Sequence, residues 1–94
     1  MSIKLEVPLV AASNQVSSEL GSEAIILGLG RGMYYGLNSV GTRVWQLLKQ
    51  PVTPAGLRDQ LIAEYEVEPS TCQADLLALL EQLFAEGLIE VADL

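Results

Sequence analysis

Residues 70–87 read STCQADLLALLEQLFAEG, and this stretch decides how the rest of the chain is interpreted. Its leucines recur with helical spacing and form one apolar arc, centred on Leu76, Leu80 and Leu83. Ser70 and Gln73 have the spacing of a capping box, and Gly87 can end a helix in a left-handed turn. The stretch therefore predicts a long amphipathic helix near the end of the chain.

The charge of this region limits what the helix can bind. No lysine or arginine follows Arg58. The acids from there onward are Asp59, Glu64, Glu66, Glu68, Asp75, Glu81, Glu86, Glu90 and Asp93. A winged helix-turn-helix that reads DNA needs cations on its last helix to neutralise phosphates and to reach base edges. We therefore expect no nucleic acid as a partner.

Two shorter helices are predicted before the long one. Asn38-Ser39 is a polar capping pair for a helix that runs to about Lys49. Thr53 caps a second helix, with Pro54 at its first position, where a missing N–H costs nothing. That helix runs to about Tyr65.

Residues 15–37 predict a three-stranded antiparallel meander. Residues 15–20 alternate apolar and polar side chains, and residues 23–29 form an apolar, β-branched run. Glycines at 21, 30 and 32 predict the two tight turns, and residues 33–37 form a third, aromatic strand. The predicted fold class is α+β, winged helix-turn-helix-like, with this sheet followed by three helices.

The length of the chain sets the number of domains. Ninety-four residues, half of them apolar, are enough for one modest core. We assign residues 15–94 to a single winged-helix-like domain, and residues 1–14 to an N-terminal arm or short strand. Residues 88–91 are expected to add a short extended tail.

Composition argues against an enzyme. The chain has no histidine and a single cysteine, Cys72, so the usual zinc and haem ligand sets and a Cys-His pair cannot be assembled. The carboxylates Asp75, Glu81 and Glu86 are spread along a helix as a solvated face. With a net charge of -7 and only short apolar runs, we expect a cytoplasmic protein with no membrane partner, no metal and no cofactor.

The third strand and the long helix are the candidate binding surface. If the strands pair in order, the third strand lies at an edge with unpaired N–H and C=O groups. The strand period places Tyr35 and Leu37 toward the core and Tyr34 outward. Leu79, at the flank of the apolar arc, is the leucine most expected to lie outside the core. The edge of the third strand and the apolar arc of the long helix together predict a groove between them.

Several segments resemble the family typified by pyrroloquinoline quinone biosynthesis protein D, also called RiPP recognition elements. The stretch from Val16 to Val91 carries the resemblance. The matching segments are Gly32-Met33-Tyr34-Tyr35-Gly36-Leu37-Asn38, Gly41, Val44-Trp45, Asp75-Leu76, Leu79-Leu80, Leu83 and Gly87-Leu88-Ile89. The strand at 16–20 and the Tyr-Tyr-Gly-Leu-Asn segment further resemble stand-alone members from lasso-peptide clusters.

The resemblance implies a non-catalytic protein that binds the leader of a ribosomally made precursor peptide by strand addition. It implies that the leader is presented to modifying enzymes, in the lasso subgroup a leader peptidase and a cyclase. The implied peptide-binding residues are Met33, Tyr34, Tyr35, Gly36, Leu37, Cys72, Asp75, Leu76, Leu79, Gln82 and Leu83.

Two other classes of function remain open from the residues alone. One is a winged-helix transcriptional regulator, which the acidic third helix disfavours. The other is a structural or dimerising subunit of a biosynthetic complex that uses the same strand edge for self-pairing. A monomer or a weak dimer is compatible with each of them.

Overall fold

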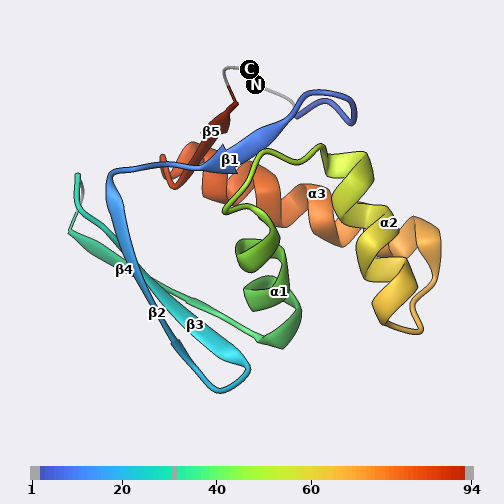
Figure 1. The fold of residues 1–94 in the computed structure, drawn as a ribbon, viewed down its shortest axis with the longest axis horizontal. Helices are drawn as coiled ribbons and strands as arrows, with labels where there is room; N and C mark the ends of the chain where they lie inside the picture. The colour runs from blue at the N-terminus through green and yellow to red at the C-terminus, as the bar shows by residue number, and fades with distance from the viewer. Residues whose placement is uncertain (1–2, 31, 93–94) are drawn as a thin grey trace.

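A computed structural model describes residues 3–30 and 32–92 of the chain. The elements in chain order are β1 (Leu9–Ala11), β2 (Gln15–Leu20), β3 (Glu23–Gly28), β4 (Met33–Leu37), α1 (Ser39–Leu47), α2 (Pro54–Glu64), α3 (Pro69–Ala85) and β5 (Ile89–Val91). An antiparallel sheet of β2, β3 and β4 precedes three helices, which confirms the predicted α+β class. Figure 1 shows α1 between this sheet and the pair formed by α2 and α3.

The three-stranded sheet has the predicted order, β2-β3-β4, so β4 lies at an edge. Leu20 pairs with Glu23 across a two-residue turn, in which Gly21 has a φ of 65°. That left-handed conformation is open to glycine without steric cost, and it matches the twist of a hairpin. Arg31, predicted at the centre of the second turn, lies outside the described residues.

The N-terminal segment pairs with the C-terminal segment. In this second small sheet, β1 runs antiparallel to β5, with Leu9 opposite Val91 and Ala11 opposite Ile89. The Leu9 N–H also donates to the Val52 carbonyl at 2.8 Å, which ties β1 to the connection between α1 and α2. Since β1 is used here, the described part of the N-terminal arm, residues 3–14, does not pair with β4 (Figure 1).

The first two helices begin where their caps predict. The Asn38 side chain accepts a hydrogen bond from the Gly41 N–H at 2.8 Å at the start of α1. The Thr53 hydroxyl accepts one from the Gly56 N–H at 3.0 Å at the start of α2. These side chains satisfy backbone donors that the first turn of a helix leaves unpaired.

The predicted capping box of α3 is wrong. The cap lies two residues earlier, at Glu68, which makes no side-chain capping bond, and the helix begins at Pro69. Proline is well suited to the first helical position, because its φ is preset and its missing N–H leaves one donor fewer to satisfy. Gln73 instead accepts a hydrogen bond from Arg58 Nη1 at 2.8 Å.

The predicted end of α3 is confirmed. Gly87 has a φ of 74°, and the Leu88 N–H donates back to the Leu83 carbonyl at 2.9 Å. The Gly87 N–H donates to the Phe84 carbonyl at 3.0 Å, which completes a Schellman motif. The motif turns the chain sharply into β5, whose pairing with β1 holds the end of α3 against the body.

The core lies between the inner face of the sheet and the helices. The sheet contributes Ala24 and Ile26, and Trp45 of α1 is fully buried at the centre. The opposite face of the sheet carries Val16, Leu27 and Tyr34 side by side across its three strands. Tyr34 therefore points away from the helices, and its side chain is 72% exposed.

None of the helices within residues 3–30 and 32–92 has the length and hydropathy needed to span a bilayer.

Candidate functional site

The free edge of β4 presents backbone groups from alternate residues. The Leu29 N–H donates to the Asn14 carbonyl at 3.0 Å, directly across the register of β2 and β3. Bonded and non-bonded pairs alternate along an antiparallel ladder, so the backbone groups of Met33, Tyr35 and Leu37 face β3. Those of Tyr34 and Gly36 point outward. The edge therefore offers two donors and two acceptors to an incoming strand.

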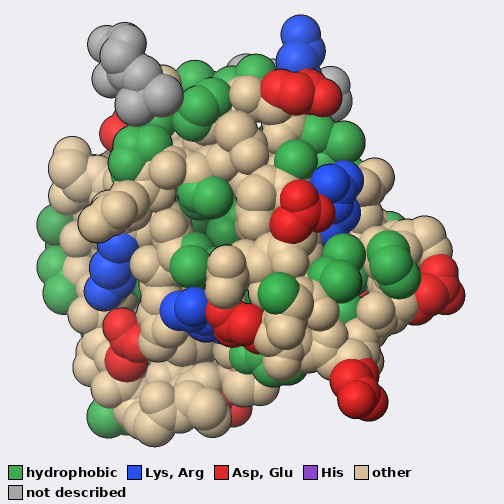
Figure 2. All heavy atoms as spheres, turned by 45° about the vertical axis from the view of Figure 1, so that its right-hand side comes forward, with side chains coloured by type: hydrophobic (Ala, Val, Ile, Leu, Met, Phe, Trp, Pro, Cys, Tyr) green, Lys and Arg blue, Asp and Glu red, His purple; other side chains and the backbone are tan. Residues whose placement is uncertain are grey.

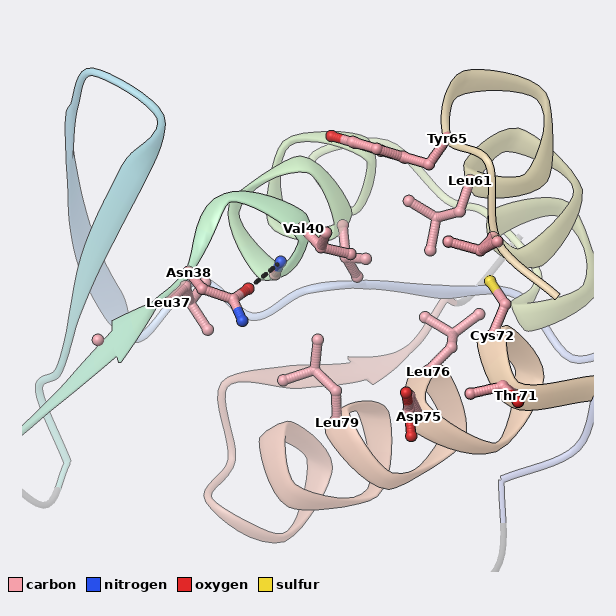
Figure 3. A pocket seen from close by; sticks show the side chains of 14 residues that line it. Leu37, Asn38, Val40, Leu61, Tyr65, Thr71, Cys72, Asp75, Leu76 and Leu79 are labelled. Carbon is pink, nitrogen blue, oxygen red and sulfur yellow. Dashed lines mark hydrogen bonds between the residues drawn. The ribbon is translucent and has the colours of Figure 1, made fainter. Parts of the chain in front are cut away.

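A pocket of about 430 Å³ opens where this edge ends. Its walls come from the last residues of β4, the first turns of α1, the connection between α2 and α3, and the first half of α3. Figure 3 shows side chains from these segments facing a common space, with Leu79 and Leu76 on one wall and Val40 opposite. The edge and the pocket form a continuous slot, since Gly36 and Leu37 belong to both.

Six of the predicted binding residues meet in this pocket: Gly36, Leu37, Cys72, Asp75, Leu76 and Leu79. Leu76 is almost fully buried and forms the floor, while Leu79 and Cys72 are half-buried. Leu79 thus lies outside the core, at the flank of the apolar arc. An apolar wall with partly exposed leucine and cysteine side chains is suited to an apolar side chain of a ligand.

The other predicted residues lie elsewhere. Met33 and Tyr34 are exposed along the edge strand, and Gln82 is exposed on α3 without lining the pocket. Leu83 is packed in the core, with 3% of its surface exposed. Tyr35 points toward α3, where its hydroxyl donates a hydrogen bond to Glu86 Oε2 at 2.6 Å.

Sequence reasoning missed the wall of the pocket that faces α3. This wall includes Asn38, Val40, Tyr65 and Val67. No signal in the sequence separates Val40 from core positions, because it has the helical spacing of Val44 and Leu47, yet Val40 and Val67 are 40% and 42% exposed. The sequence does not reveal that the start of α1 and the α2–α3 connection approach each other, because that depends on how the helices pack.

The cations near the pocket are already paired. Arg43 of α1 donates to both carboxylate oxygens of Glu64, with an Nη2–Oε2 distance of 2.7 Å. The hydrogen bonds from Arg43, and then from Gln60, lower the pKa of the Glu64 carboxyl to about 2. Arg58 of α2 bonds to Asp59 and Gln73. Figure 2 shows acidic side chains standing out at several places on the face it presents, with hydrophobic side chains exposed between them.

Three comparisons relate this geometry to known proteins. The family model described as coenzyme PQQ synthesis protein D (PqqD) matches residues 23–89. That range contains the edge strand, the pocket and all three helices. A search of curated proteins found no match.

Two solved structures share the fold. The structure described as TbiB1 in complex with the TbiA(beta) leader peptide superposes with a TM-score of 0.80 at 35% identity, over 89% of this chain and 99% of that one. A lasso peptide synthetase B1 complexed with its leader peptide superposes with a TM-score of 0.75 at 24% identity, over 87% of this chain and 96% of that one. The second likeness concerns the fold alone.

Proposed function

This chain belongs to the PqqD family, and we propose that it binds the leader of a ribosomally made precursor peptide and presents it to modifying enzymes of a lasso-type pathway. The partners we propose are the precursor, a leader peptidase and a cyclase. The observation that carries the proposal is the free edge of β4, which continues directly into an apolar pocket.

The leader adds to β4 as an antiparallel strand. Its backbone pairs with the outward N–H and C=O groups of Tyr34 and Gly36, each hydrogen bond contributing about 1 kcal/mol. Because β4 runs toward the pocket, an antiparallel leader runs away from it. The residues on the N-terminal side of the added strand therefore occupy the pocket, and the segment to be processed leaves near Met33.

The pocket supplies selectivity that the edge cannot. Backbone pairing accepts almost any sequence, whereas burial of one large apolar side chain contributes about 1.5–3 kcal/mol. Leu76 and Leu79 offer the apolar surface for such a side chain on α3, and Val40 offers it on α1. Affinity then depends on the leader placing an apolar residue at this point.

The protein acts as a binding module without chemistry of its own. Cys72 is the only cysteine of the chain, and no histidine exists to activate it. The pocket contains no pair of carboxylates that could share acid and base roles, since Asp75 is the single acid among its lining residues. Cleavage and ring closure belong to the partner enzymes.

The proposal is tested by fluorescence anisotropy with two labelled peptides. One is the TbiA(beta) leader peptide, and the other is a peptide of the same composition in scrambled order. We expect saturable binding of the first. Leu79→Glu, which places a charge in the pocket, and Tyr34→Pro, which removes one outward N–H of β4, should each weaken it at least 10-fold.

Matched variants separate binding from folding. Leu77→Glu changes another half-buried leucine of α3 that does not line the pocket. Ser17→Pro removes an outward N–H from β2, the opposite edge of the same sheet. Both should keep the wild-type affinity when circular dichroism shows them folded. Failure of the TbiA(beta) leader to bind, or equal losses in the control variants, would reject the proposal.

A further inference from the structure

Asp75 is the single charged side chain among the residues that line the pocket. It projects from α3, and Figure 3 shows its carboxylate on the pocket wall between the side chains of Leu76 and Leu79. The pocket is otherwise lined by apolar side chains and a few neutral polar groups, among them Asn38 and Thr71. A charge in this position has no role in packing the core, because Asp75 is exposed.

The carboxylate of Asp75 has no hydrogen bond or ion pair with any residue in the described part of the chain. The arginines of the neighbouring helices are committed elsewhere: Arg43 holds Glu64 in a two-oxygen contact, and Arg58 bonds to Asp59 and Gln73. A ligand that brings a cation would meet an unpaired anion beside an apolar surface.

The Asp75 carboxylate beside the apolar side chains of Leu76 and Leu79 favours a leader lysine or arginine at this place over any other polar residue. Both side chains have long apolar stems, which can lie along Leu76 and Leu79 while the charged group reaches the carboxylate. Apolar walls displace water and thereby reduce the screening of a nearby ion pair. An acidic residue at the same place is repelled by Asp75 and by the net charge of -7 on the chain.

We propose that Asp75 is a specificity-determining residue that selects leaders carrying a lysine or arginine beside the apolar residue in the pocket. This inference rests on the proposed leader binding. Because the pocket lies at the Leu37 end of β4, the cation belongs to the N-terminal side of the added strand. An acid at that position weakens binding of the leader.

The test is a charge scan of the leader against three forms of the protein. The probes are synthetic copies of the TbiA(beta) leader peptide, in which each residue on the N-terminal side of the strand is replaced in turn by lysine, glutamine or glutamate. They are titrated against the wild type, Asp75→Lys and Glu81→Lys. Glu81 is an exposed acid on the same helix that does not line the pocket.

At one or two positions, lysine should bind the wild type about 5-fold more tightly than glutamate. Asp75→Lys should reverse that order at the same positions, and Glu81→Lys should keep it. The preference should shrink in 1 M salt, where surface charges are screened within about 3 Å. If no position changes its charge preference in Asp75→Lys while the unaltered leader still binds, this inference fails and leader binding stands. If the unaltered leader does not bind the wild type, the proposed function itself fails.

Discussion

The Tyr35 hydroxyl donates a 2.6 Å hydrogen bond to Glu86 Oε2 and so ties the edge strand β4 to the C-terminal end of α3. The pocket lies further along β4, next to Leu37, and against the first half of α3. The slot between strand and helix is therefore bridged at one end and open at the other. A peptide along β4 meets the apolar walls of the pocket toward the Leu37 end.

Removing this bridge should loosen the slot. We expect Tyr35→Phe to cost about 0.5–1.5 kcal/mol of unfolding free energy, because a hydrogen bond between half-buried groups is lost. Leader affinity should fall a few-fold as well. Urea denaturation and leader titration measure the two effects.

Tyr34→Phe is the control: the neighbouring hydroxyl is exposed, so its removal should leave stability within about 0.5 kcal/mol of the wild type. Equal effects of the two substitutions would show that the bridge has no structural role.

Local signals in the sequence were sufficient for most of the fold. Gly21 and Gly87 mark turns that need a positive φ, while Asn38 and Thr53 mark helix starts through side-chain caps. Each of these signals acts within four or five residues, so it can be recognised without knowing the tertiary structure. The edge position of β4 followed from the two turns that precede it.

Contacts between distant segments could not be predicted in the same way. The pairing of β1 with β5 joins strands of three residues from opposite ends of the chain, and no periodic pattern of three residues specifies a partner. The start of α3 was misplaced because Pro69 and Ser70 are competing start signals, and the proline prevails. In the binding site, α3 was recognisable from its leucines. Val40 and Val67 were missed because their approach depends on how α1 packs against the α2–α3 connection.

Cys72 allows the pocket to be probed directly. Its thiol is half-buried, lines the pocket, and is the only thiol of the chain. Saturating leader should slow the reaction of Cys72 with a disulfide reagent at least 10-fold, because the peptide covers the thiol. The rate is followed by absorbance.

The control is the double variant Cys72→Ser, Ser18→Cys. Its thiol lies on the outer face of the sheet, so the leader should leave the rate of its reaction unchanged. Protection of both thiols would indicate a general effect of the peptide and not occupancy of the pocket.

The ion pair of Arg43 and Glu64 should make the unfolding free energy depend on pH in the acid range. The pKa of Glu64 lies at about 2 in the folded protein, below its ordinary value of 4.5. A lowered pKa stabilises the fold fully above pH 4.5, and this contribution is lost as the pH falls toward 2. The dependence of the urea midpoint on pH between 5 and 2 should therefore be less steep in Arg43→Gln than in the wild type. Glu64→Gln removes the carboxyl itself and should show the same reduced slope. Wild-type steepness in both variants would contradict this prediction.

If the leader binds as an added strand, N-methylation of its backbone amides should reduce affinity at every second residue. Since Tyr34 and Gly36 alone turn their N–H and C=O groups to the free edge within β4, only alternate leader residues can bond to them. N-methylation of single leader amides removes one donor at a time and leaves the side chains intact. Titrations of such a series should show losses of about 5- to 10-fold at alternate residues, and small effects at the residues between them. A helical leader in the same slot would instead lose affinity at every residue beyond its first turn, because each of those amides bonds within the helix, so the pattern of the losses distinguishes the two modes of binding.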